Sequence, residues 1–144
     1  MVDQPNPPLI QATDTIPPSR QALAEALSLS AEILRNIELS ELALANIALK
    51  TSRLARLLNE FAIQKIMEYE AGGYPATMGG MPPDIWQLAV AAGRKFEIPD
   101  AKTRELKPYV YMESIGQLEE QLRTVEASLT AARDPDVAIS SANP

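Results

Sequence analysis

The 144-residue chain contains neither cysteine nor histidine, and these two absences exclude much chemistry. Without cysteine there is no disulfide framework, thiol nucleophile or iron–sulfur ligation, and without histidine there is no imidazole base and no ordinary zinc site. A Ser–Lys dyad, a carboxylate-only magnesium site or a glycosidase-like acid pair remains chemically open, but no motif for any of them occurs. We therefore expect a protein that is not an enzyme and that uses no metal or cofactor.

Aromatic residues, basic charge and long apolar runs are also scarce. Aromatics make up 5% of the chain, so its core must come chiefly from Leu, Ile, Val and Ala, which favours helices over a β-sandwich. The net charge of −6 opposes attraction to phosphates, which makes nucleic acid an unlikely partner. No apolar run approaches the roughly 20 residues of a membrane span, and no signal peptide is apparent. We expect a cytoplasmic protein without a membrane anchor.

Proline and small polar residues are concentrated at the two ends. Residues 1–18 carry five prolines and no Lys or Arg, which predicts a flexible leader. Residues 19–133 hold the periodic segments and form the predicted helical domain. Residues 134–144 begin with Asp-Pro and predict an extended or disordered tail. A chain that stops in such a tail suggests a boundary to a further domain.

Apolar residues spaced three and four apart predict three helices in the first half of the domain. The predicted ranges are Ser19–Ile37, Ser40–Leu58 and Asn59–Gly72, and each range begins at its predicted N-cap residue. The short connection between the first two helices predicts that they are antiparallel. Glycine can terminate the third helix because it readily adopts positive φ.

The second half of the domain predicts a loop, a short helix, a hairpin and a long helix. The Gly- and Pro-rich residues 71–83 predict a loop, and Asp84 predicts the cap of a helix that Gly93 closes. Residues 95–112 contain two short β-favouring runs and predict a β-hairpin, with an ordered surface loop as the alternative. The last helix should run from about Glu113 or Ser114 to Arg133. The fold class is therefore mainly α, a bundle of four to five helices with a small β-hairpin.

A heptad-like apolar seam runs along the last predicted helix, and it is one of two candidate partner-binding surfaces. Its residues are Leu118, Leu122, Val125 and Leu129. The seam could pair with a second copy in a homodimer, or it could pack on the first two helices of its own chain. We expect the second arrangement because about 20 residues are few for an independent coiled coil.

Basic residues form the other candidate surface. Lys50, Arg53 and Arg56 lie three apart and share one face of the second helix, where they could meet an acidic partner or a phosphate. A second basic cluster comprises Arg94, Lys95, Lys102, Arg104 and Lys107, but three acids lie among them. A solvated surface is the alternative interpretation of the first set, since no glycine-rich phosphate loop accompanies it.

Neighbouring carboxylates do not predict an acid–base pair. Glu68 and Glu70 are two residues apart, and Glu119 and Glu120 are adjacent. Side chains at these spacings point in different directions on a helix. Neither pair therefore predicts a catalytic or metal site.

The segment LKTSRLARLLNEFAIQKIMEYEAGGYP, with the helices before it, resembles the amino-terminal AbiTii-type domain of bacterial abortive-infection proteins. The residues that carry the resemblance are Ser52, Leu54, Ala55, Leu58, Glu70, Gly73 and Tyr74. The resemblance covers about Leu23 to Pro75. It implies a helical module of anti-phage defence, often attached to other domains, and it transfers no catalytic residues.

Three functions follow as hypotheses. The first is a non-catalytic interaction or regulatory module of a bacterial defence protein, with a protein or a further domain of the same chain as its partner. The second is a small homo-oligomeric scaffold or adaptor that associates through its last helix. The third is a ligand or nucleic-acid binder that uses the basic helix face.

Overall fold

The computed structural model describes residues 16–134, and the five helices and two strands in that range confirm a mainly α fold. Along the chain the elements are α1 (Arg20–Glu38), α2 (Leu44–Leu57), α3 (Phe61–Gly72), α4 (Pro83–Ala91), β1 (Lys95–Pro99), β2 (Leu106–Val110) and α5 (Ile115–Arg133). Most of the predicted leader and tail, residues 1–15 and 135–144, lies outside the described residues.

Serine caps start the two longest helices. The Ser19 hydroxyl accepts a hydrogen bond of 3.1 Å from the Ala22 amide, as its sequence position predicts. At α5, the Ser114 hydroxyl accepts from the Gln117 amide and the Gln117 side chain accepts from the Ser114 amide. This reciprocal pair is a capping box, which satisfies two amides that the helix itself leaves unpaired. The predicted start of the last helix is confirmed.

Three other predicted caps are wrong. Ser40 and Asn59 have φ angles of 52° and 59°, so they adopt the left-handed conformation just past the ends of α1 and α2. Short polar residues tolerate that conformation better than most, and it removes them from the N-cap position of the next helix. At α4, Pro82 is the N-cap, Pro83 lies at the helix start and Asp84 falls in the first turn.

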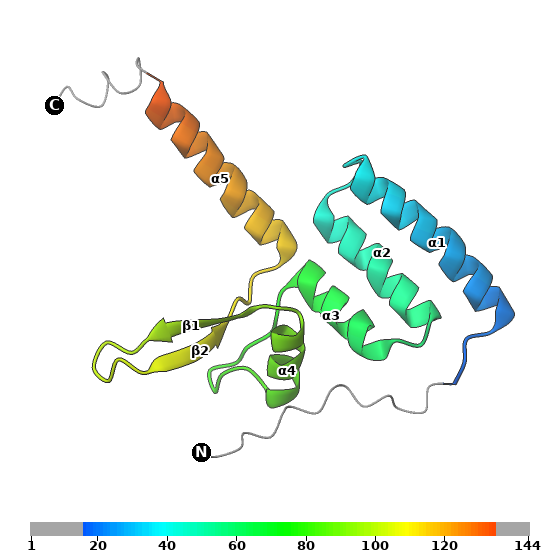
Figure 1. Cartoon of the computed structure of the whole chain (residues 1–144), viewed down its shortest axis with the longest axis horizontal. Coiled ribbons are helices and arrows are strands. Elements are labelled where there is room, and N and C mark those ends of the chain that lie inside the picture. Colours follow the sequence, from blue (N-terminus) through cyan, green and yellow to red (C-terminus); the bar gives the residue numbers. More distant parts are fainter. Residues whose placement is uncertain (1–15, 135–144) are drawn as a thin grey trace.

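Helices α1, α2 and α3 lie side by side, with α2 between the other two (Figure 1). The predicted antiparallel arrangement of α1 and α2 is confirmed. Their buried apolar side chains include two from α1, three from α2 and one from α3: Ala26, Ile33, Ile47, Ala48, Ala55 and Ile66. Half of these residues are alanine, whose small side chain permits close approach of the helices. We call α1, α2 and α3 the helical layer.

The predicted hairpin is confirmed, and β1 and β2 pair antiparallel from Lys95 opposite Val110 to Pro99 opposite Leu106. Hydrogen bonds from Tyr111 to Arg94 and from Asp100 to Glu105 bracket the ladder. In an antiparallel ladder, hydrogen-bonded residue pairs alternate with pairs that are not hydrogen-bonded, and Pro99 and Pro108 fall in pairs of the second kind. Their backbone nitrogens therefore face away from the partner strand. Proline there costs no ladder bond, and it leaves each outer edge with one donor fewer for a further strand.

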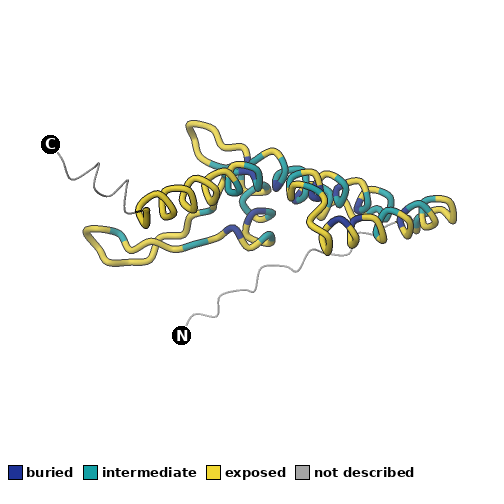
Figure 2. Tube along the Cα trace, turned by 90° about the horizontal axis from the view of Figure 1, so that it is seen from above, coloured by how far each residue is buried: buried dark blue, intermediate teal, exposed yellow. Residues whose placement is uncertain are grey.

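Helix α5 projects away from the helical layer and begins beside the hairpin (Figure 1). Its first turns contact α2 and α3, and the Leu44 amide donates a hydrogen bond of 3.4 Å to Glu119. From Glu120 to Asp134, however, every residue is exposed, as the colouring of Figure 2 shows. The prediction that the seam packs on the first two helices is therefore wrong beyond Glu119, because α5 leaves the body at an angle to them.

Candidate functional site

Glu70, Tyr74 and Arg94 form a buried polar cluster, which we call the Glu70 cluster. The Arg94 guanidinium binds both carboxylate oxygens of Glu70, with a distance of 2.8 Å between Nε and Oε1. The Tyr74 hydroxyl donates a second hydrogen bond to Oε1, also at 2.8 Å. Glu70 comes from α3, Tyr74 from the loop after it, and Arg94 from the residue just before β1. Three segments are thus joined at one carboxylate.

The Glu70 cluster is closed to solvent. Glu70, Tyr74 and Arg94 are only 8%, 4% and 8% exposed. Burial and the hydrogen bond to the Glu70 carboxylate raise the pKa of Tyr74 above its ordinary value, so the phenol stays neutral. The hydrogen bond to Glu70 raises the pKa of Arg94 as well. Since each charged group already has its partner, the cluster is suited to holding segments together rather than to proton transfer.

Backbone contacts next to the Glu70 cluster fix the start of α5. The Tyr74 amide donates a hydrogen bond of 2.8 Å to the Met112 carbonyl, in the linker between β2 and α5. Gly73 has φ 93° and ψ 157°, a conformation open essentially only to glycine. A Cβ atom at Gly73 would lie 3.3 Å from the Met112 oxygen, so the linker approaches as closely as a glycine allows. The direction of α5 is therefore set by the end of α3.

The predicted basic face of α2 is largely used inside the chain. Lys50 forms an ion pair with Glu32 and Arg53 forms one with Glu25, both acids of α1. Lys50 also donates a hydrogen bond of 2.8 Å to the buried Asn36 side chain. These contacts explain part of the adhesion between α1 and α2. A role of Lys50, Arg53 and the exposed Arg56 in partner binding stays a prediction.

The second basic cluster loses its first member, because Arg94 is buried against Glu70. Lys95 forms an ion pair with Glu97, with 3.1 Å between Nζ and Oε1, and Lys107 forms one with Asp100.

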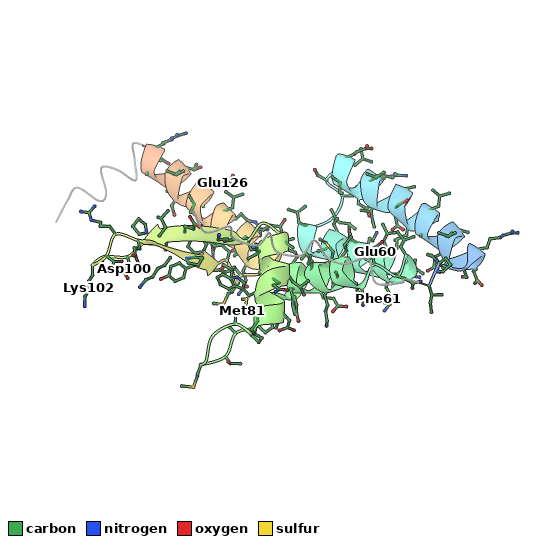
Figure 3. All side chains as sticks on the ribbon, turned by 60° about the horizontal axis from the view of Figure 1, so that its bottom comes forward. Glu60, Phe61, Met81, Asp100, Lys102 and Glu126 are labelled. Carbon is green, nitrogen blue, oxygen red and sulfur yellow. The ribbon has the colours of Figure 1, made fainter. Side chains whose placement is uncertain are left out.

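The hydrogen bond from Lys107, with those from two loop amides, lowers the pKa of Asp100 to about 2. Figure 3 shows Asp100 and Lys102 at the end of the hairpin. Without Arg94, the second basic cluster has four cations, Lys95, Lys102, Arg104 and Lys107, and three carboxylates lie among them. This small excess of positive charge gives only a weak attraction for nucleic acid.

The predicted seam of α5 is present on one face, and most of it is uncovered. Leu118 is half-buried where α5 meets the helical layer. Leu122, Val125 and Leu129 are 59%, 54% and 53% exposed. This row offers apolar surface to a partner, and continuous apolar surface typically marks an interaction site.

Sequence reasoning missed the pairing of Glu70 with Arg94. It compared Glu70 only with Glu68 and placed Arg94 in a surface cluster, although the two partners lie 24 residues apart in the chain. One available signal was the family resemblance, which named Glu70, Gly73 and Tyr74 together. Among residues 16–134, no three acidic side chains are gathered closely enough to hold a metal ion. In the same range, no helix has the length and apolar content needed to cross a bilayer.

Within residues 16–134, these features define a mainly α domain with a buried glutamate–arginine pair and a last helix that is uncovered beyond Glu119. Residues 28–140 match the AbiTii family, so the chain belongs to the AbiTii family and is a domain related to abortive infection, an anti-phage response. The match confirms the resemblance and extends it through the hairpin and α5. No curated protein and no solved structure matches the chain.

Proposed function

We propose that this chain is a non-catalytic interaction module of an anti-phage defence protein and that it binds a protein partner through the exposed face of α5. The observation that carries the proposal is the row formed by Leu122, Val125 and Leu129, each more than half exposed. Their spacing of three and four places them on one side of the helix. Helix-in-groove recognition uses anchors at these same spacings.

The low stability expected of an uncovered helix supports the proposal that a partner covers α5. Its exposed part runs from Glu120 to Arg133, about 14 residues, and a helix of that length is marginal in water on its own. Most helical stability in proteins comes from packing of an apolar face. Covering three large side chains would contribute about 1.5–3 kcal/mol for each fully buried one, before the costs of association.

The anchoring of α5 supports the same function. Its first turn has the capping box at Ser114, and the linker before it accepts a hydrogen bond from the amide of Tyr74, a member of the Glu70 cluster. A binding helix held in a fixed direction loses less conformational freedom on association than a flexible one. The helical layer would therefore act as the base that presents α5.

The test is a phage challenge with the complete gene carrying Leu122→Glu and Leu129→Glu. Two buried charges at an interface oppose docking, so we expect protection to be lost while circular dichroism and thermal stability stay near those of the natural protein.

The matched control is Ala127→Glu with Ala131→Glu, which adds the same charge on the side of α5 away from the seam. The control should protect as well as the unmodified gene. Full protection by the seam variant would contradict the proposal.

A further inference from the structure

We propose that the partner that covers α5 is a second copy of this chain, with the two α5 helices antiparallel. The inference rests on the proposed function, because it names the partner of the same surface. It goes beyond that function because it fixes the composition and the geometry of the complex.

The seam has the period of a helix that pairs with another helix. Its apolar residues alternate in steps of four and three, and no polar residue interrupts them: Leu118, Leu122, Val125, Leu129 and Ala132. This average of 3.5 residues is the repeat of knobs-into-holes pairing. Two identical seams related by a two-fold axis are complementary to each other, which makes a second copy a natural occupant.

The position of the exposed surface favours the antiparallel direction. The exposed stretch runs from residue 120 to residue 134, the C-cap that follows α5, and its midpoint is Ala127. A two-fold axis at Ala127 places Val125 against Leu129 of the second copy and Leu122 against Ala132 of the second copy. Each layer joins a larger with a smaller side chain. Of the part of α5 that contacts α2 and α3, only Glu119 at its edge reaches the second copy, and the two helical layers lie at opposite ends of the pair.

Charges beside the seam agree with this direction. Glu119, Glu126 and Arg133 lie seven residues apart, so they form one stripe along the edge of the seam. Antiparallel pairing about Ala127 brings Arg133 of the other copy toward Glu119 Oε2, the carboxylate oxygen that the hydrogen bond from the Leu44 amide does not use. Glu126 meets its own counterpart at the axis, with Arg123 one turn away on the same helix. The two attractive pairs exceed the single repulsive one.

The hairpin offers a less suitable surface for self-association. Strand addition needs a free edge with regular donors, and each outer edge carries a proline. Pro99 interrupts the edge of β1, and Pro108 interrupts the edge of β2. Helix α1 also exposes Leu23, Leu27, Leu34 and Ile37 at the same spacing, but Ser30 interrupts that row. The uninterrupted face of α5 is therefore the better fit for a second copy.

The first measurement is the mass of the full chain by sedimentation across a concentration series. We expect a dimer that forms as concentration rises, and a monomer for Leu122→Glu with Leu129→Glu. The variant Ala127→Glu with Ala131→Glu should still dimerise. A monomeric natural chain at about 1 mM, where an association of about −4 kcal/mol would already show, would overturn the inference.

The second measurement reads the direction of the helices, and the absence of natural cysteine makes it clean. Val125→Cys and Leu129→Cys are prepared as separate exposed-site variants, mixed and oxidised. Antiparallel pairing predicts that the mixed disulfide exceeds the half expected from random pairing. Predominance of the two homodisulfides would overturn the antiparallel arrangement.

The phage assay separates failure of the inference from failure of the proposed function. If the natural chain is monomeric but the seam variant loses protection, the proposed function stands and a second copy is the wrong partner. If the natural chain dimerises through the seam and the monomeric seam variant still protects, the dimer stands and its proposed role in defence is wrong.

Discussion

Helices α1 and α5 are each 19 residues long, and each begins at a serine N-cap. Helix α1 buries Ala26, Ile33 and Asn36 against its neighbours, whereas no residue of α5 is buried. Both helices have apolar residues at helical spacing, so the difference lies in what stands opposite the apolar face. An amphipathic pattern thus predicts that a face will be covered, but it does not identify the partner.

The ion pairs of the two regions differ in the same way. Glu70 and Arg94 have side chains that are 11% and 10% exposed, whereas Glu120 and Arg123 of α5 are 68% and 72% exposed. Water screens the pair on α5, but it has little access to the buried pair. Stability should therefore depend strongly on the first pair and weakly on the second.

The largest expected effect is that of Arg94→Met, which leaves the Glu70 carboxylate buried without its cation. We expect the free energy of unfolding to fall by about 3–5 kcal/mol in urea titrations. Arg123→Met removes the exposed cation of α5 and should cost less than about 1 kcal/mol. Equal losses in the two variants would show that the buried pair contributes no more to stability than the exposed pair.

A smaller effect is expected where α5 is anchored. Gly73→Ala forces a strained φ and brings a Cβ atom against the Met112 carbonyl, so we expect a loss of about 3 kcal/mol. Gly72→Ala is the control, because a Cβ there meets nothing within 4 Å and alanine favours the helix. Thermal unfolding of both variants measures the difference, and a tolerated Gly73→Ala would show that the close approach is not needed.

The smallest of the three effects concerns alkaline pH. The pKa of Tyr74 is raised in the folded chain, so the stability that its neutral phenol contributes is complete below pH 10 and is lost as pH rises above that value.

The ionisation of Tyr74 should cost the natural chain at most about 1.4 kcal/mol per pH unit there, and Tyr74→Phe should reduce this dependence. At neutral pH, Tyr74→Phe should cost about 2 kcal/mol for the lost hydrogen bond to a charged group. The exposed Tyr109→Phe keeps the alkaline dependence, and urea titrations across pH 8–11 would reveal any departure.

Local signals were enough to predict most elements of the fold. Ser19 and Ser114 marked helix starts, Gly93 marked the end of α4, and β-favouring runs marked the hairpin. These features act over a few residues, so they can be read from neighbouring positions. The wrong caps at Ser40 and Asn59 arose because a polar residue between helices can end one helix as well as start the next.

The candidate site was less accessible to prediction. The seam residues of α5 were identified from their spacing, but their exposure was not predicted. Their exposure depends on the direction of α5, which is fixed where the linker between β2 and α5 accepts a hydrogen bond from Tyr74. Lys50 and Arg53 were identified as a basic face, yet α1 supplies carboxylates to both. Ion pairs across helices depend on helix rotation, which the spacing within one helix does not specify.

By itself, the sequence determined the class of this protein: mainly helical and without the side chains of thiol, imidazole or ordinary zinc chemistry. It also determined where the long helices begin, because capping and periodicity are local. Only the tertiary structure decided that Glu70 meets Arg94 in a buried cluster and that α5 stays uncovered beyond Glu119. Both outcomes depend on contacts between segments far apart in the chain, which are set by packing rather than by local preference.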